Sequence, residues 1–385
     1  MHNPPCLWAL GMSLAGTLLA APAAAQQQSG AFVTLLGSDT IAAERYTHAG
    51  DRIVGREVIR TPRTTITDYM ATLAADGTVS HVEVQSQRPG EPEPYQRATI
   101  EFGADSALVT TWRPDRTRSY RVAAPRGSIP WVSMSMALYE PALRWARSAG
   151  VDSAAVALVP PGSQSFAATL RRTGSRSFEV RHVAGAYRME VDEQGRITAW
   201  DGTASTVQVL AERVPSLDLD FLAAAFLARE QANGAMGLLS PRDSVRATLG
   251  SASLVVDYGR PSRRGRRIFG NVVPWGKVWR AGANAATHLR TDRALVIGGV
   301  VVPAGTYTLW TLPSLAGWKL ILNRQTGQWG IEYDPERDLV RVEMRVERLP
   351  EAVDQFTIAV EPEGDGGRLV LLWDDTRAWV PISTR

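Results

Sequence analysis

Apolar and polar residues alternate along most of the chain. In the first half, such runs cover residues 65–73, 79–87, 99–111, 177–182, 187–191 and 207–214. Asp76-Gly77 and Gln194-Gly195 lie between runs, where hairpin turns are expected. Period-two alternation places one face of a strand in the core and the other in solvent. The pattern predicts a long antiparallel sheet that curves around its apolar face, as a half-barrel does.

One segment of the first half departs from this alternation. Within residues 130–150, Met134, Leu138 and Trp145 fall on one face of a helix. Pro141 can start a second helix, and Gly150 can end it. We expect one or two helices that pack on the sheet.

Residues 216–234 carry the clearest helical pattern. Ser216 is the expected N-cap, while Asp218 and Asp220 suit the positive end of the helix dipole. Asn233-Gly234 should end the helix. The expected apolar face consists of Leu217, Phe221, Leu222, Ala225 and Phe226. This helix is predicted to join two domains.

Strand patterns return from Leu238 onward. Residues 339–349 alternate with Val340, Val342, Met344 and Val346 inward, and residues 245–249, 254–258, 286–291, 305–310, 318–323 and 356–360 predict further strands. Gly298-Gly299 and Asp374-Asp375 are predicted as two-residue hairpin turns. Many short strands of this kind are typical of a β-sandwich.

The expected fold is therefore mostly β, with two antiparallel β domains joined by a helix. The N-terminal domain, a curved sheet or half-barrel with a helical insert, should span residues 26–215. A linker helix should span residues 216–237, and a C-terminal β-sandwich residues 238–385.

Residues 1–25 are predicted to be a signal peptide. An apolar run over residues 7–21 is followed by Pro22 and by Ala23-Ala24-Ala25, a small-residue cleavage pattern. Cleavage after Ala25 would place the protein in the periplasm or outside the cell. No transmembrane segment is expected after cleavage. Cys6 is the one cysteine, so the mature chain would contain no thiol and no disulfide.

Composition narrows the possible partners and cofactors. The chain has 385 residues, 44% hydrophobic and 21% charged, as in a folded globular protein. Its formal charge is only +3, and acids and bases alternate along it, so no nucleic-acid partner is expected. The five histidines lack metal-ligand spacing, and we predict neither a metal nor a cofactor. The oligomeric state is not indicated.

Residues 274–288, PWGKVWRAGANAATH, combine polar side chains with small residues that let the backbone approach a neighbour closely. Arg280 offers a fork of donors for a carboxylate, a phosphate or a sugar hydroxyl. Asn284 can both donate and accept hydrogen bonds. Tryptophans nearby offer stacking faces for a ring. The segment predicts a pocket for a small molecule or a glycan.

The C-terminal motifs occur in a recognisable order. They read SPRDSV, DYGRPSRRGRRIFG, VPWGKVWRAGANAATH, VPAGTYTLWTLP, WKLILNRQTGQWG and a closing LLWDDTRAWVPI. Over about residues 238–382 this order resembles the bacterial family called domain of unknown function 2911. The resemblance implies an exported or periplasmic β-rich protein and implies no reaction. Residues 30–214 show only a general similarity to curved half-barrel sheets of the cell envelope.

The candidate ligand-binding residues are Tyr258, Lys277, Trp279, Arg280, Asn284, Thr287, His288 and Trp329. A purely structural interpretation remains open. In it, Arg280 pairs with Asp257 or Glu332, Asn284 satisfies a bent backbone, and the tryptophans lie in the core. A nearby cluster of arginines over residues 260–267 is expected to form a solvated loop.

Three functions are compatible with the sequence. The first is a binding or structural module of the cell envelope, with a pocket around Arg280 and Asn284. The second is a hydrolase of glycans or small esters, although no catalytic motif is recognisable, so enzymatic activity is left open. The third is a protein whose N-terminal sheet binds a lipid or a partner. Two carboxylates in the pocket of Arg280, or His288 with a carboxylate and a serine, would favour the enzyme. Aromatic residues with Arg280 alone would favour binding.

Overall fold

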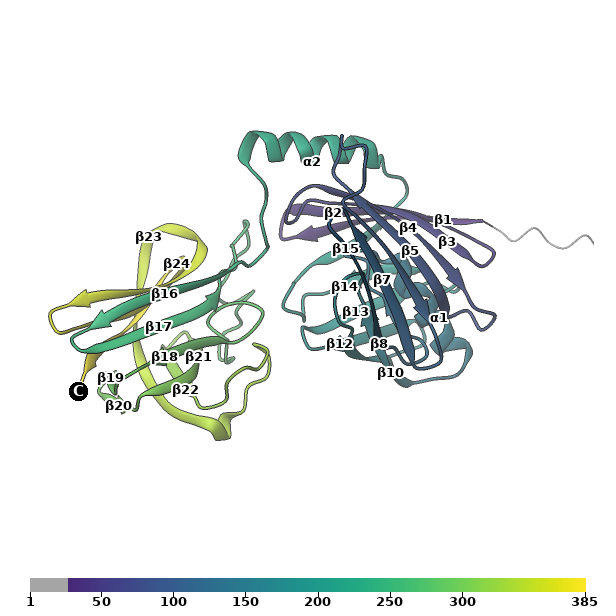
Figure 1. Cartoon of the computed structure of the whole chain (residues 1–385). Coiled ribbons are helices and arrows are strands. Elements are labelled where there is room, and N and C mark those ends of the chain that lie inside the picture. Colours follow the sequence, from purple (N-terminus) through teal and green to yellow (C-terminus); the bar gives the residue numbers. More distant parts are fainter. Residues whose placement is uncertain (1–26) are drawn as a thin grey trace, which may run out of the picture.

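The computed structural model describes residues 27–385, so the expected signal peptide lies outside the described residues. Figure 1 shows two β-rich halves joined by a helix, α2. The mostly-β fold with two antiparallel sheets and a helical insert is thereby confirmed.

The first sheet contains fifteen strands. They are β1 Gln28–Leu36, β2 Asp39–Ala49, β3 Arg52–Ile59, β4 Thr65–Leu73, β5 Val79–Gln87, β6 Gln96–Phe102, β7 Ser106–Arg113, β8 Arg116–Ala123, β9 Ile129–Pro130, β10 Ser153–Val159, β11 Phe166–Arg172, β12 Ser177–His182, β13 Gly185–Val191, β14 Ile197–Asp201 and β15 Leu210–Val214. β1 pairs with both β2 and β15, so the first described strand lies in the middle of the sheet. β8 and β9 form its edges, and the sheet curves as an open half-barrel (Figure 1).

Strand alternation predicted several of these strands, although the run over residues 207–214 forms a strand only from Leu210. Residues 65–73, 79–87 and 177–182 form β4, β5 and β12 with the expected bounds. The single run predicted over residues 99–111 is wrong, because it contains two strands, β6 and β7. They are separated by a tight turn in which the Gly103 amide donates to the Ser106 carbonyl at 2.8 Å.

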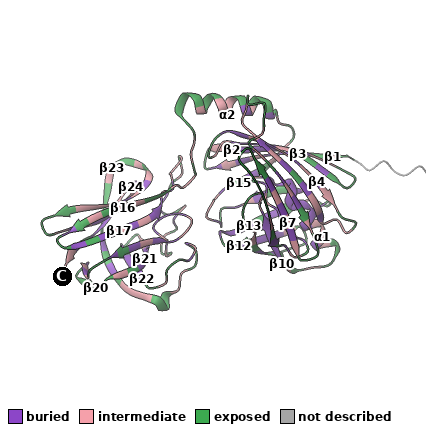
Figure 2. Cartoon of the chain, in the orientation of Figure 1, coloured by how far each residue is buried: buried purple, intermediate pink, exposed green. Residues whose placement is uncertain are grey.

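The helical insert lies against the inner face of the first sheet. A single 3₁₀ turn, η1 Ala137–Tyr139, leads into α1 Glu140–Ser148, with Pro141 in its first turn. Leu138 and Leu143 share a core with Ile53 and other strand residues. Figure 2 shows buried residues along this inner face. The insert is thus one α-helix with a short lead-in, and it fills the curve of the sheet.

The linker helix α2 spans Leu219–Asn233 and ends at Gly234, as expected. Its N-cap is Asp218, whose carboxylate accepts a hydrogen bond from the Phe221 amide at 2.9 Å, so the prediction of Ser216 as the cap is wrong. The apolar face is shifted accordingly. Leu219, Ala223 and Phe226 are buried against the outer face of β2 and β3, whereas Phe221 is 70% exposed.

The second sheet contains nine strands in the order β16-β17-β18-β21-β22-β23-β24-β19-β20. They are β16 Arg242–Leu249, β17 Ala252–Gly259, β18 Thr287–Thr291, β19 Leu295–Ile297, β20 Val300–Val302, β21 Gly305–Ser314, β22 Gly317–Asn323, β23 Asp338–Glu363 and β24 Gly366–Thr384, with a 3₁₀ turn, η2 Pro335–Arg337, before β23. β23 pairs first with β22 and then with β24, so one long strand passes between the two layers. Their facing side chains form a common core.

Two expectations about these long strands are wrong. Asp374-Asp375 is no hairpin turn, because β24 continues through it to Thr384. Asp374 has a φ of +54° and lies where the register between β23 and β24 shifts, as in a β-bulge. Val346 is 43% exposed and does not point inward, because β23 exchanges β22 for β24 at this point.

Candidate functional site

Residues 279–286 form a loop that is held at both ends by backbone pairing. Trp279 and Thr311 exchange two backbone hydrogen bonds of 2.8 Å, and Ala285 forms a bridge with Trp329. Between these points Ala281 and Asn284 have φ values of +44° and +61°. Non-glycine residues with positive φ cost free energy and occur often at functional sites. The loop therefore keeps an unfavourable backbone shape.

Glycines allow this loop to lie close to its neighbours. A Cβ atom on Gly259 would lie 2.3 Å from the Ala283 carbonyl oxygen, so no larger residue fits there. A Cβ atom on Gly330 would lie 2.1 Å from Cδ of Arg280. The Arg280 side chain thus crosses the backbone at Gly330, and the WG pair at residues 329–330 makes room for it.

The guanidinium of Arg280 has no counterion. Its Nε is buried without a hydrogen-bond partner, and within residues 27–385 its guanidinium takes part in no hydrogen bond or ion pair. Burial lowers the pKa of Arg280 to about 10, and no carboxylate acts against that effect. The side chain as a whole is half-buried, so the cation is desolvated in part, at Nε, and no protein acceptor compensates that loss of water.

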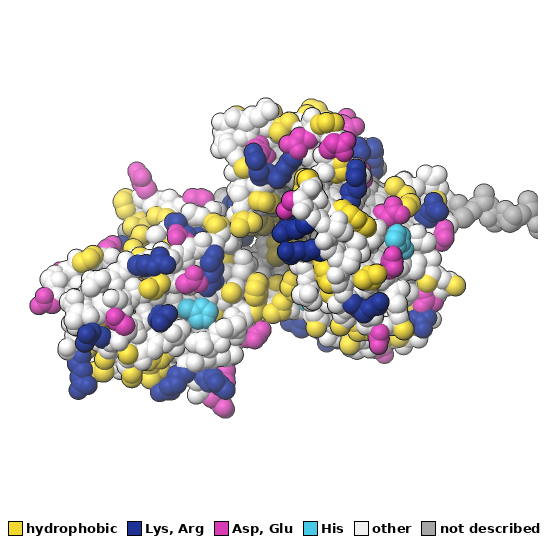
Figure 3. Space-filling view, viewed as in Figure 1, with side chains coloured by type: hydrophobic (Ala, Val, Ile, Leu, Met, Phe, Trp, Pro, Cys, Tyr) yellow, Lys and Arg dark blue, Asp and Glu magenta, His cyan; other side chains and the backbone are white. Residues whose placement is uncertain are grey.

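Arg280 borders a cavity of about 340 Å³ between the two sheets. The lining residues are Leu36, Thr61, Met134, Thr206, Val207, Gln208, Leu238, Leu239, Ser240, Pro261, Arg266, Val272, Trp279, Arg280, Gly282, Ala283, Asn284 and Trp373. Figure 3 shows a hollow between the two halves, bordered by hydrophobic side chains. Two arginines and no acidic or histidine side chain line the cavity in the described part of the chain. Its walls therefore favour an anion.

Three of the candidate residues meet at this cavity: Trp279, Arg280 and Asn284. Trp279 is also part of the core, where it stacks on Trp373 with ring centroids 5.7 Å apart. The side-chain amide of Asn284 forms no hydrogen bond with another described residue, and its backbone carbonyl accepts from Gly330 at 2.9 Å. Arg280 and Asn284 are thus the polar groups of this loop that remain available to a ligand.

The structure does not bring the other candidates to the cavity. Lys277 is exposed. Thr287 is buried and its hydroxyl donates to the Ala281 carbonyl at 2.8 Å. The Tyr258 hydroxyl lies in the core and accepts from the Ile358 amide at 3.0 Å. His288 accepts from the Gly327 amide at 3.1 Å, and burial lowers its pKa. Trp329 is half-buried, and its Nε1 has no partner among the described residues.

The ion pairs of the structural alternative do not form. Asp257 pairs with Arg242 and not with Arg280. Within the described chain, Glu332 takes part in no ion pair with Arg280. The alternative is correct for the tryptophan Trp310, which lies in the core and is only 2% exposed. Tyr258 and Thr287 also serve the fold through their bonds to the backbone.

The arginine-rich loop at residues 260–267 is packed rather than solvated. Arg263 forms an ion pair of 2.9 Å with Asp374, which is 8% exposed. Arg266 borders the cavity, and each of its three guanidinium nitrogens donates to an oxygen, those of Arg263, Gln208 and Ser262. Burial lowers the pKa of Arg266. This loop therefore forms part of the contact between the two halves.

The first sheet contributes cavity residues that the sequence did not point to. Gln208 has a φ of +56°, and its side chain accepts from Arg266 at 3.1 Å and donates to the Val272 carbonyl at 3.4 Å. Thr206 and Val207 lie beside it in the lining. No motif marks this segment, so only the placement of the two sheets could identify it.

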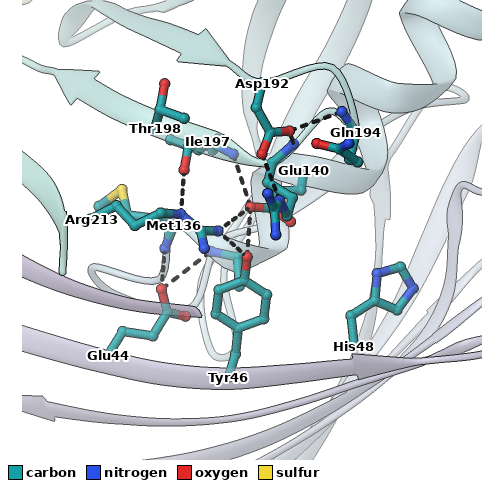
Figure 4. Close-up of polar contacts among 12 residues, drawn as sticks. Glu44, Tyr46, His48, Met136, Glu140, Asp192, Gln194, Ile197, Thr198 and Arg213 are labelled. Carbon is teal, nitrogen blue, oxygen red and sulfur yellow. Dashed lines mark hydrogen bonds and ion pairs between the residues drawn. The ribbon is translucent and has the colours of Figure 1, made fainter. Parts of the chain in front are cut away.

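A separate polar cluster fixes α1 to the first sheet (Figure 4). The buried Glu140 carboxylate accepts from the Tyr46 hydroxyl at 2.7 Å, the Ile197 amide at 2.9 Å and Arg213 at 3.2 Å. Arg144 adds a bond of 2.8 Å. Burial raises the pKa of Glu140, and these donors oppose the rise. Because groups of the protein itself donate to both oxygens of the Glu140 carboxylate, this cluster is part of the fold.

Two more buried acids face each other across β2 and β3. Glu44 accepts from the hydroxyls of Tyr69 and Ser135 and from the amides of Met136 and Ala137. Glu57, its cross-strand partner, accepts from the Met134 amide at 3.1 Å, while its Oε2 is buried without a partner. Burial raises the pKa of both, and that of Glu57 strongly. Both acids hold the segment that precedes α1.

Neither a metal centre nor a membrane-spanning helix is found in the part of the chain that the structure describes. Residues 27–385 hold no group of three histidine or acidic side chains that could bind a metal ion. No helix in this range is long and apolar enough to cross a membrane.

Comparisons with known proteins agree with the motifs of the C-terminal part. No curated protein matches the chain. Among solved structures, the chain is similar to the crystal structure of a DUF1089 family protein from Pseudomonas aeruginosa, with a TM-score of 0.34 and 14% identity, over 44% of this chain and 93% of that chain. Residues 240–382, the C-terminal part of the chain, match the family described as Protein of unknown function (DUF2911).

Proposed function

We propose that the protein binds a small organic anion in the cavity between its two sheets, and that Arg280 holds the anionic group. One observation carries this proposal. The Arg280 side chain is half-buried at the cavity with its Nε fully buried, and its guanidinium has no hydrogen bond or ion pair within residues 27–385. Isolated buried charges are unfavourable, and folded proteins nearly always give them a partner. A ligand anion would be that partner.

The chemistry of the loop suits a carboxylate. A guanidinium can donate two parallel hydrogen bonds to a planar carboxylate, and such charge-assisted bonds are stronger than neutral ones. The Asn284 amide borders the same cavity and has no partner among the described residues, so it can donate to the same ligand. Backbone pairing at both ends of the loop fixes the chain that carries these two groups before the ligand arrives.

The lining supports binding more than hydrolysis. Acid–base hydrolysis requires a positioned carboxylate or histidine, and the described lining contains neither. His288, the histidine nearest in sequence, is engaged with Gly327. The inner face of the first sheet is packed against α1, which favours the cavity between the sheets over a lipid site inside the first sheet.

We also propose that the protein acts in the periplasm or outside the cell. The apolar run and the alanines at residues 23–25 support export. The mass of the native protein should then correspond to a chain that begins at Gln26.

Calorimetric titration with benzoate and benzamide tests the anion site. The two molecules have nearly the same shape and differ in charge, so their difference in affinity reports the cation. We expect wild-type protein to bind benzoate at least about tenfold more tightly than benzamide, the contribution of one charge-assisted contact. In Arg280→Gln this preference should disappear.

Arg246→Gln is the matched control, because Arg246 is exposed on β16 and bonds only to Ser244 among the described residues. This variant should keep the full preference for benzoate. Equal affinities of the wild-type protein for benzoate and benzamide, or a preference that survives in Arg280→Gln, would reject the anion site.

A further inference from the structure

The two walls of the cavity differ in charge. Both arginines, Arg266 and Arg280, come from loops of the second sheet. The first sheet and the segment after α2 contribute only uncharged residues, namely Leu36, Thr61, Met134, Thr206, Val207, Gln208, Leu238, Leu239 and Ser240. A molecule that fills the space thus meets a cation on one side and mainly apolar side chains on the other.

Only one cationic group is available to the ligand. Every guanidinium nitrogen of Arg266 already donates to an oxygen of the protein. Arg280 has no such acceptor in the described chain. The cavity can therefore compensate one negative charge well, and a second anionic group on the ligand would lose its water without a partner.

Two of the uncharged polar side chains of the lining already form hydrogen bonds. The Thr61 hydroxyl donates to the Gly237 carbonyl at 2.8 Å, and the Gln208 amide bonds to Val272 and Arg266. Sugar binding requires several free donors and acceptors around the ring. Within the described lining the side chains of Thr206, Ser240 and Asn284 have no such bond, so the case for an apolar ligand body rests on the open apolar surface and not on a lack of polar groups.

Apolar surface is left open at the cavity. Leu238 is 61% exposed although it borders the space, and the stacked rings of Trp279 and Trp373 form another part of the lining. The volume of about 340 Å³ is near the lower end for small-molecule pockets, too small for a lipid with two acyl chains.

We infer that the ligand is an amphiphilic monocarboxylate, with its single charge on Arg280 and a short apolar body against the first sheet and Leu238. This inference rests on the proposed function, because it requires the Arg280 anion site. It adds that the apolar body contributes to affinity and that a second charge opposes binding. Aliphatic and aromatic acids share this chemistry.

Titration with a matched set of ligands tests this inference. Octanoate and 2-naphthoate supply an aliphatic and an aromatic body, acetate lacks the body, octan-1-ol lacks the charge, and suberate carries a second carboxylate at the far end. We expect octanoate or 2-naphthoate to bind at least about tenfold more tightly than the other three. The stronger of the two acids identifies the kind of body.

A variant of the apolar wall gives an independent test. Leu238→Ser should weaken the binding of the stronger-binding acid several-fold and leave the binding of acetate unchanged. Because Leu238 is exposed, we expect no folding defect in this variant. Leu315→Ser is the control, since Leu315 is 85% exposed outside the cavity lining and should change nothing.

The possible failures are distinguishable. If acetate or suberate binds as tightly as octanoate and 2-naphthoate, and Arg280→Gln abolishes that binding, the anion site stands and the amphiphilic ligand is rejected. If octan-1-ol binds as tightly as octanoate and its affinity is unchanged in Arg280→Gln, both the anion site and the amphiphilic ligand are rejected. If no acid binds, the proposed function itself fails.

Discussion

Arg280 is the residue on which the functional proposal depends. Desolvating a charge without a partner costs several kcal/mol, and proteins often gain stability when such a group is replaced by an apolar one. The fold nevertheless makes room for this side chain through Gly330. A half-buried cation that has no protein partner and lines a cavity is best explained by something that it binds.

The buried acids Glu44 and Glu57 should make the stability of the protein depend on pH. Burial raises the pKa of Glu57 well above 4.5, so the folded protein keeps this proton at pH values where the unfolded chain has lost it. The folded state then binds more protons, and its stability falls as the pH rises from about 4.5 through the raised pKa. Burial also raises the pKa of Glu44, so its contribution to stability likewise falls as the pH rises.

We therefore expect Glu57→Gln to flatten this loss of stability and to be at least as stable as the wild type at pH 8. Glutamine keeps an acceptor for the Met134 amide and cannot ionise. Glu44→Gln should instead lose about 2–4 kcal/mol, because its amide nitrogen would face donors. Urea unfolding between pH 5 and 8 measures both. A steeper pH dependence in Glu57→Gln would show that the carboxylate is ionised in the folded protein.

At this scale the sequence pointed to some of the residues that line the cavity. Arg280 and Asn284 could be singled out because polar groups among small residues are unusual. Tyr258 and Thr287 belong to the same motifs but bond to the backbone, at Ile358 and Ala281. A motif shows that residues matter and does not separate packing from binding. Gln208 had no signal, because its role depends on a contact with a distant loop.

Among the elements, α2 shows how a local bond decides a boundary. Two residues of the segment can cap a helix, and Asp218 does so through the Phe221 amide. We expect Asp218→Ala to lower the free energy of unfolding by about 1 kcal/mol, with Ser216→Ala close to zero. Equilibrium urea unfolding compares the two. A larger loss in Ser216→Ala would contradict the assigned cap.

Strands were easier to predict than their ends. Period-two alternation follows directly from burial of one face, which is why β4, β5 and β12 have the expected bounds. Asp374 shows the limit of that pattern. Two adjacent aspartates favour a turn, yet Asp374 pairs with Arg263 and accepts from the Ile268 amide at 3.1 Å, so β24 bends and continues. Those partners lie more than a hundred residues away along the chain.

For the whole molecule, the cavity arises from the contact between the two sheets. Each sheet has its own core, and alternation along the strands predicts each of them. The way the sheets meet depends on single contacts such as that of Gln208 with Arg266, which no periodicity reveals. The boundaries at residues 215 and 238 remain predictions, and Leu239 packs against the core of the first sheet.

An anion that binds between the sheets must stabilise the folded molecule, because it binds the native state alone. Removing Arg280 should abolish that gain while the ligand-free protein keeps its stability. Arg263→Leu is the matched control in the neighbouring loop. It should lower stability by about 3 kcal/mol, because it leaves the buried Asp374 without its cation.

The most direct measurement is the thermal unfolding of Arg280→Leu with and without benzoate, beside the wild type. The ligand-free variant should melt within about 2 °C of the wild type or above it, and benzoate should raise the melting temperature of the wild type only. A large drop in the melting temperature of the ligand-free variant, or a benzoate shift that the variant retains, would contradict the account and return Arg280 to a structural role.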